Sequence, residues 1–259
     1  MNFATLDEEN LIKIDTKIEN KIDFSILKNI KEVSIETGID WQHISMCNLS
    51  FKYNVHELSN GEKGLYLFRI EDLTDFYNKS VLCCSSYKNF KAQIDSPDIK
   101  NNAIDYKPSL IIKKKEKNSC NCFSFESIFE IFQNFGNEDK LFCVISYIKK
   151  CDSFNFYLGE RENSMKYKVV GEFSNVKNSC YKLFNFENFK PKPVNFDIIL
   201  PLAIEIKVGS LTKYYRSSFE DLNVEKLIVD FPPEASAEEK VMFICLGAII
   251  NLVLFGEND

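Results

Sequence analysis

The sequence predicts an all-β fold with one helix: a closed antiparallel barrel of about 12 strands around a buried hydrophobic C-terminal helix. Two observations predict it. Short strand-like segments recur along most of the 259 residues, with turn signals between many of them. A single long apolar run, at 237–255, ends the chain. Closing a sheet of this size removes its exposed edges, and the interior that results needs filling, so the apolar helix is expected inside.

The helix is expected over about 236–255. Ser236 and Glu239 have the spacing of a capping box, which predicts that the helix begins beside them. Residues 241–255 contain one polar side chain, Asn251, and no charge. This run of about fifteen residues is shorter than the roughly 17–25 that a helix needs to cross a bilayer. No Lys or Arg follows the run as an interfacial anchor. Burial is favoured over a membrane span, and the span stays open as the alternative.

Residues 1–23 are expected to form a mobile N-terminal segment, and residues 24–259 the barrel domain with its helix. Residues 24–35 fit either a short helix or a strand. Turn signals such as the SNGE sequence at 59–62 separate the strands. Strands are expected at 50–55, 65–70, 90–94, 110–114, 141–148, 154–158, 166–173, 196–200, 204–208, 213–216 and 227–231.

The charge of the chain gives no sign of an electrostatic nucleic-acid binder, because the net charge is −6. One local exception is a basic run made of Lys113, Lys114, Lys115 and Lys117. It fits a patch that binds anionic membrane surfaces, a nuclear-localisation signal, or a solvated turn between strands. The start of the chain shows neither a signal peptide nor the Met-Gly of N-myristoylation.

Because no signal peptide is visible, the nine cysteines, an odd number, are expected in a reducing compartment. Two close groups, Cys83 with Cys84 and Cys120 with Cys122, lack the two-residue spacers of zinc knuckles. They sit in loop-like, polar or basic surroundings, which suits S-acylation. Other cysteines have apolar neighbours and are expected as small core residues: Cys143, Cys151 and Cys245.

Catalysis is not expected of this chain. It has no Gly-rich phosphate loop, no nucleophile elbow and no paired-carboxylate signature. Its only histidines, His43 and His56, are expected to be ordinary surface or loop residues.

From about residue 24 to the end, ordered patches of the chain resemble the phospholipid scramblases. The patches are TGIDW at 37–41, YNV at 53–55, GEKGLY at 61–66, CC at 83–84, FKAQID at 90–95, KPSL at 107–110, CNC at 120–122, VI at 144–145, Cys151, Phe154, VGSLTKYY at 208–215, FP at 231–232 and GA at 247–248. The resemblance implies a tubby-like barrel closed around its C-terminal helix. It also implies palmitate on the cysteine clusters, the second cluster above all.

The activity that the resemblance implies is ATP-independent, calcium-activated movement of phospholipids between membrane leaflets in both directions. The partners would be membrane phospholipids at the cytoplasmic face of the plasma membrane, with a nuclear pool of protein that is not acylated. The alternative is a membrane-tethered or nuclear lipid-binding and interaction module of the same fold without scrambling activity. No specific nucleic-acid binding is expected.

The family's calcium-binding segment corresponds to 223–234 in this chain. The candidate ligands are Asn223, Glu225, Asp230 and Glu234, whose carboxylate and amide oxygens suit calcium. Lys226 places an ammonium group where the family has an oxygen ligand, which should weaken the site. The apolar alternation of Leu227, Val229 and Phe231 also predicts a strand that faces the barrel interior.

Overall fold

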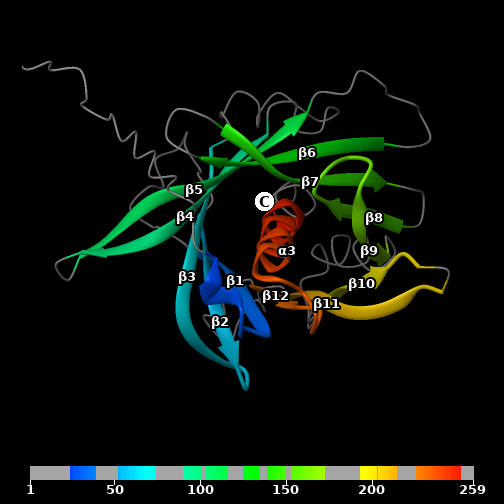
Figure 1. Cartoon of the computed structure of the whole chain (residues 1–259). Helices are drawn as coiled ribbons and strands as arrows, with labels where there is room; N and C mark the ends of the chain where they lie inside the picture. The colour runs from blue at the N-terminus through cyan, green and yellow to red at the C-terminus, as the bar shows by residue number, and fades with distance from the viewer. Residues whose placement is uncertain are drawn as a thin grey trace, which may run out of the picture.

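The computed structural model describes residues 24–38, 52–73, 90–100, 103–115, 125–134, 139–149, 153–172, 193–202, 204–214 and 226–251. Within these residues the chain forms a closed barrel of twelve antiparallel strands with one α-helix inside it (Figure 1). This confirms the fold that the sequence predicts. The N-terminal segment expected at 1–23 lies outside the described residues.

Each strand of the barrel is hydrogen-bonded to the next along the chain, and β1 closes the ring by pairing with β12. The strands are β1 (Glu32–Gly38), β2 (Lys52–Ser59), β3 (Glu62–Asp72), β4 (Lys91–Lys100), β5 (Ala103–Lys115), β6 (Phe125–Asn134), β7 (Asp139–Lys149), β8 (Ser153–Gly159), β9 (Met165–Glu172), β10 (Val194–Leu200), β11 (Ile206–Tyr214) and β12 (Lys226–Asp230).

The strands differ from the sequence expectation at several points. β4 and β5 extend well beyond the strands expected at 90–94 and 110–114. β6 was not expected, because Glu and Gln interrupt its apolar residues, yet Phe129 and Ile131 are fully buried. The strands expected at 204–208 and 213–216 are instead one strand, β11. Gly209 suggests a break but lies within β11, where a Cβ atom would come 2.6 Å from the Asp230 carbonyl oxygen. The glycine therefore permits a close approach to β12.

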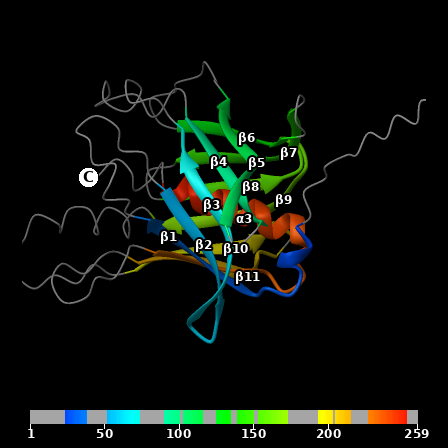
Figure 2. The ribbon, with the colours of Figure 1, turned by 90° about the vertical axis from the view of Figure 1, so that its left-hand side faces the viewer.

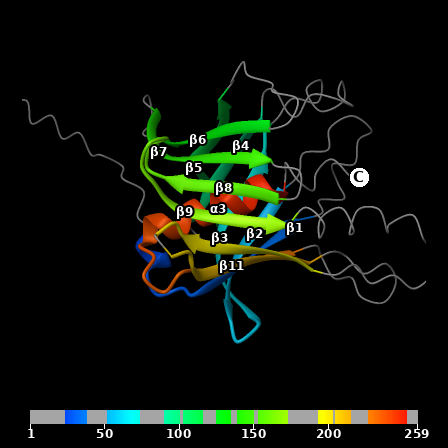
Figure 3. The ribbon, with the colours of Figure 1, turned by 90° about the vertical axis from the view of Figure 1, so that its right-hand side faces the viewer.

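The sequential order gives the barrel two distinct ends. The β2–β3, β4–β5, β6–β7, β8–β9 and β10–β11 connections share the end where the C-terminal helix begins, here named the start end. The opposite end, where that helix finishes, is named the finish end. Figures 2 and 3 show the helix lying lengthwise inside the barrel between these ends.

The helix, α3 (Ala237–Ile249), is buried over almost its whole length. It begins with the expected capping box: the Ser236 hydroxyl accepts from the Glu239 N–H, and the Glu239 carboxylate accepts from the Ser236 N–H. A helix that is apolar on every side is stable only when it is surrounded, and the barrel surrounds it. Within the described part of the chain, no helix combines the length and the hydropathy that a bilayer span requires.

Close contact between α3 and the barrel wall depends on Gly247. A Cβ atom there would lie 2.5 Å from Ile35 Cδ1 of β1 and 2.9 Å from Leu227 Cδ2 of β12. Aromatic side chains fill the other side of the interior, where the Tyr147 and Phe156 rings stack with centroids 4.9 Å apart. Each such buried side chain contributes about 1.5–3 kcal/mol of transfer free energy. The barrel is therefore a packed core.

Candidate functional site

Two of the four candidate calcium ligands lie in the described residues, close to the start end. Asp230 ends β12 and Glu234 lies in the turn before α3, and both are exposed. The other two, Asn223 and Glu225, lie outside the described residues. The strand pattern is confirmed here, because Leu227, Val229 and Phe231 are all buried in the core.

A second carboxylate lies beside Asp230, at a position that no sequence pattern singled out. Glu32 of β1 is the direct register partner of Asp230 across the seam that closes the barrel. Burial raises the pKa of Glu32, the Asp230 charge raises it further, and the Lys226 ammonium acts in the opposite direction. The pair concentrates negative charge at one point. Across the described residues, no group of three or more His, Cys, Asp or Glu side chains is placed to hold a metal ion.

Most of the basic run lies in a strand rather than in a turn. Lys113, Lys114 and Lys115 end β5, and Lys117 lies outside the described residues. The Lys113 ammonium is 2.8 Å from Asp139, and the Lys115 ammonium is 2.5 Å from Glu162 and 3.3 Å from Glu130. The carboxylates of Glu162 and Glu130 raise the pKa of Lys115. Because carboxylates balance two of its lysines, the run attracts anionic lipid less than its sequence suggests.

The cysteines divide into two sets. Cys83, Cys84, Cys120 and Cys122, the predicted acylation sites, lie outside the described residues, as does Cys151. Cys143 of β7 and Cys245 of α3 are fully buried free thiols, as expected of core residues. Burial raises the pKa of both thiols. They are therefore poor nucleophiles in the folded protein, since the thiolate is the reactive form.

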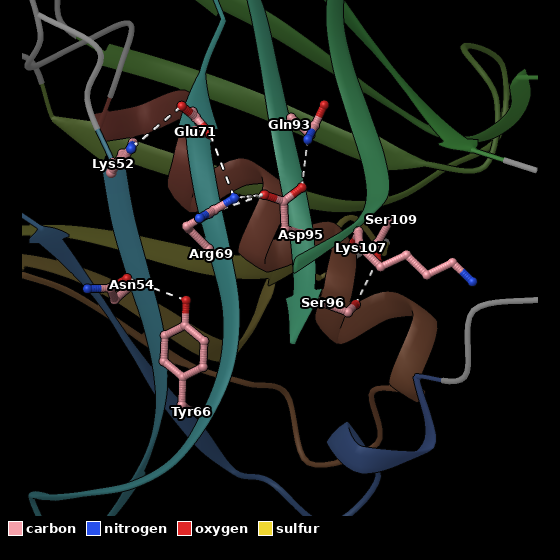
Figure 4. A network of polar contacts seen from close by, with 10 residues as sticks. All are labelled: Lys52, Asn54, Tyr66, Arg69, Glu71, Gln93, Asp95, Ser96, Lys107 and Ser109. Carbon is pink, nitrogen blue, oxygen red and sulfur yellow. Dashed lines mark hydrogen bonds and ion pairs between the residues drawn. The ribbon is translucent and has the colours of Figure 1, made fainter. Parts of the chain in front are cut away.

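A polar network covers the outer face of β2 to β5 (Figure 4). Ile70 and Ile94 point into the core, so their neighbours Arg69, Gln93 and Asp95 point outward. The Asp95 carboxylate accepts from Arg69 Nη2 at 2.7 Å and Nε at 3.2 Å, and from Gln93 Nε2 at 2.7 Å. These contacts leave Asp95 only 1% exposed.

Aromatic rings cover this network. The Arg69 guanidinium lies 3.7 Å from the centre of the Tyr106 ring, and Tyr106 packs edge-on against Tyr66. Burial and the neighbouring Tyr106 hydroxyl raise the pKa of Tyr66. His56, expected on a surface or loop, lies in β2 beside Tyr66, and burial lowers its pKa. These contacts join β3, β4 and β5 on the outer face of the barrel.

At the start end, a buried lysine fixes the beginning of α3. The Lys240 ammonium donates to three backbone carbonyls, those of Leu27 at 3.0 Å, Lys28 at 2.9 Å and Ile30 at 2.8 Å. These carbonyls belong to the short 3-10 helix η1 (Ser25–Leu27) and the residues after it. Burial lowers the pKa of Lys240. The contact ties α3 to the segment that leads into β1.

At the finish end, a second buried lysine reaches the other end of α3. The Lys213 ammonium of β11 donates to the Asn251 side-chain oxygen at 2.9 Å, and both side chains are almost fully buried. The Asn251 amide nitrogen has no hydrogen-bond partner among the described residues. The one polar residue of the apolar run is thus the acceptor for a buried cation. Sequence analysis singled out Asn251 but not Lys213, which looked like an ordinary strand residue.

No known family model, curated protein or solved structure matches this chain.

Proposed function

We propose that this protein acts at phospholipid membranes, as a lipid-binding barrel of the scramblase-like type. The observation that carries the proposal is the apolar helix α3 enclosed by a closed twelve-strand barrel. That architecture is what the ordered resemblance to scramblases implies. The proposal places the protein at the cytoplasmic face of the plasma membrane, with palmitate on Cys83, Cys84, Cys120 and Cys122 as an anchor.

Of the two forms of this function, the surface-bound module has the better support. Lys240 holds the start of α3 by three hydrogen bonds, and Lys213 bonds to Asn251 at its finish. Withdrawal of α3 into a bilayer would break both sets of contacts and expose the apolar barrel lining to water. Separating a buried cation from its partners costs several kcal/mol. The helix is therefore better suited to filling the core than to inserting into lipid.

Calcium-activated scrambling is the second candidate, and Asp230 with Glu32 favours it. Burial is the main reason that the pKa of Glu32 is raised, and repulsion by the adjacent Asp230 carboxylate raises it further. A divalent cation bound there with Glu234 would relieve that repulsion. Lys226 opposes such binding, because its ammonium lowers the local negative potential.

The test is a fluorescent-lipid assay on liposomes that contain purified protein, with and without calcium, combined with vesicle flotation. The module predicts vesicle binding without equilibration of labelled lipid between leaflets. Equilibration that needs calcium, and that Asp230→Asn abolishes while Glu205→Gln does not, would replace the module by a scramblase. Failure of the palmitoylated protein to bind vesicles of any composition would contradict both forms.

A further inference from the structure

The connection between β10 and β11 presents exposed apolar side chains at a tip of the barrel. Leu202 is 61% exposed, Ile204 is 77% exposed and Ile206 is 49% exposed. In Figure 1 this hairpin, in yellow at the right, reaches beyond the outline of the barrel. Leaving three large aliphatic side chains in water within five residues is unfavourable. The tip, defined as Leu202, Ile204 and Ile206, therefore suits an apolar environment.

The charges around the tip are arranged in neutral pairs. The Glu205 carboxylate is 2.7 Å from the Lys168 ammonium of β9. The Lys207 ammonium is 2.6 Å from the Asp197 carboxylate of β10. Each pair cancels its own charge, so these residues neither repel an anionic lipid surface nor depend on one. Hydrophobic contact, rather than electrostatic attraction, would control binding by the tip.

The backbone of the tip also tolerates a less polar medium. Pro201 has no N–H group to leave without a partner, and the Leu202 N–H donates to the Leu200 carbonyl at 2.8 Å. Unsatisfied backbone donors are the main obstacle to placing irregular chain in lipid, at several kcal/mol each. The start of the turn avoids that cost.

We propose that the β10–β11 tip inserts into the interfacial layer of a phospholipid bilayer. This inference rests on the proposed function, and it identifies a part of the protein that contacts the membrane. A protein partner fits less well, because a stable interface buries roughly 800 Å² on each side from about 20–30 residues. The tip offers three large apolar side chains on a projecting turn. That shape enters a fluid lipid layer more readily than it covers a flat protein surface.

The tip lies at the start end, whereas the strand ends that flank the predicted acylation cysteines meet at the finish end. There the Leu73 N–H bonds to the Lys91 carbonyl, and the Lys114 N–H bonds to the Phe90 carbonyl. The two anchors can therefore be tested separately. Purified protein without acyl chains reports on the tip alone.

The test measures flotation of this protein with vesicles of phosphatidylcholine alone and of phosphatidylcholine with phosphatidylserine. The parent chain should bind both, with little change between low and high salt. The double variant Leu202→Ser/Ile204→Ser should lower the partition coefficient by at least tenfold, since each side chain that fully leaves water accounts for roughly tenfold. The matched control Leu65→Ser, at a position 59% exposed on β3, should leave it unchanged.

A second readout places a probe in the tip. Ile204→Trp should show a blue-shifted emission with vesicles and quenching by brominated phosphatidylcholine, relative to the parent protein under the same conditions. Equal vesicle binding by parent and double variant would overturn the tip inference while leaving the proposed function in place. Loss of a concentration-dependent dimer in the double variant, with vesicle binding unchanged, would make the tip a contact between copies. Absence of vesicle binding by the unacylated parent would overturn the tip inference, and absence of binding by palmitoylated protein as well would overturn the proposed function.

Discussion

Buried lysines form hydrogen bonds at both ends of α3. The Lys240 ammonium donates a hydrogen bond to each of three backbone carbonyls. These charge-assisted hydrogen bonds compensate for the burial of its charge. Lys213 bonds to Asn251, which brings an amide into an otherwise apolar helix. Residue contacts of this kind fix the axial position of α3, because sliding the helix would separate both lysines from their acceptors.

The Asn251→Leu variant tests whether the hydrogen bond from Lys213 stabilises the position of α3 at the finish end. Hydrogen bonds to charged groups contribute about 1.5–3 kcal/mol, so the substitution should lower the free energy of unfolding by about 2 kcal/mol. Urea denaturation followed by circular dichroism measures the change. The double variant Lys213→Met/Asn251→Leu should recover part of the loss, because an apolar pair replaces a cation deprived of this acceptor. A fully stable Asn251→Leu variant would instead assign the bond no energetic role.

Only some of these contacts could be predicted from the sequence. Asn251 stood out because it interrupts an apolar run, and the Ser236–Glu239 capping box follows a local spacing rule. Lys213 and Glu32 gave no signal, because their partners are distant in the chain and are set by register across the barrel. The fold was predictable from local patterns, whereas pairing across the seam was not.

At the scale of elements, the interface of α3 with β1 and β12 is tight enough to require a residue without a side chain. Glycine is unfavourable within a helix by about 1 kcal/mol relative to alanine. Gly247 is nevertheless placed where a Cβ atom would contact Ile35 and Leu227. The same packing reason explains Gly171 in β9, where a Cβ atom would lie 2.3 Å from the Phe196 ring.

Gly247→Ala separates helix propensity from packing, because the two effects have opposite signs. Propensity alone predicts a gain of about 1 kcal/mol, and overpacking predicts a loss of about 1–3 kcal/mol. We expect a net loss, measured as a lower urea midpoint. In a double-mutant cycle with Ile35→Val, which removes the nearest methyl group, the two substitutions should couple favourably. A stabilised Gly247→Ala variant would mean that α3 sits further from β1.

Some of the observed strands differ from those that the sequence predicted. Apolar alternation located most strands, but β6 mixes acidic and aromatic residues, and its burial depends on neighbours that sequence patterns do not reveal. The break expected between 208 and 213 was wrong, because these residues continue as one strand, β11. Within β11, the backbone of β12 lies too close for a side chain at position 209, and this close approach explains the glycine.

At the scale of the whole molecule, the barrel interior should open only when the protein unfolds. Cys143 and Cys245 face that interior from the wall and from the helix, and burial raises the pKa of both thiols. Both should resist iodoacetamide in native buffer. Their modification, located by mass spectrometry across a urea series, should follow the same transition as circular dichroism.

An Ile204→Cys variant provides the exposed control for that experiment, because position 204 is 77% exposed and its thiol should react at once. Rapid modification of Cys245 in the native state, with the circular dichroism unchanged, would contradict a permanently closed interior. It would also revive a role for α3 outside the barrel.

Closure of β1 on β12 has a consequence for how the chain is made. Every other strand pairs with its neighbour in sequence, but the seam joins the first strand to the last, and α3 follows that last strand. During synthesis, β1 through β11 leave the ribosome before their closing partner and before the helix that fills them. The nascent sheet therefore has two open edges and an uncovered apolar face, a combination prone to aggregation. Chaperone demand in the cell should accordingly depend on how quickly β12 and α3 are delivered.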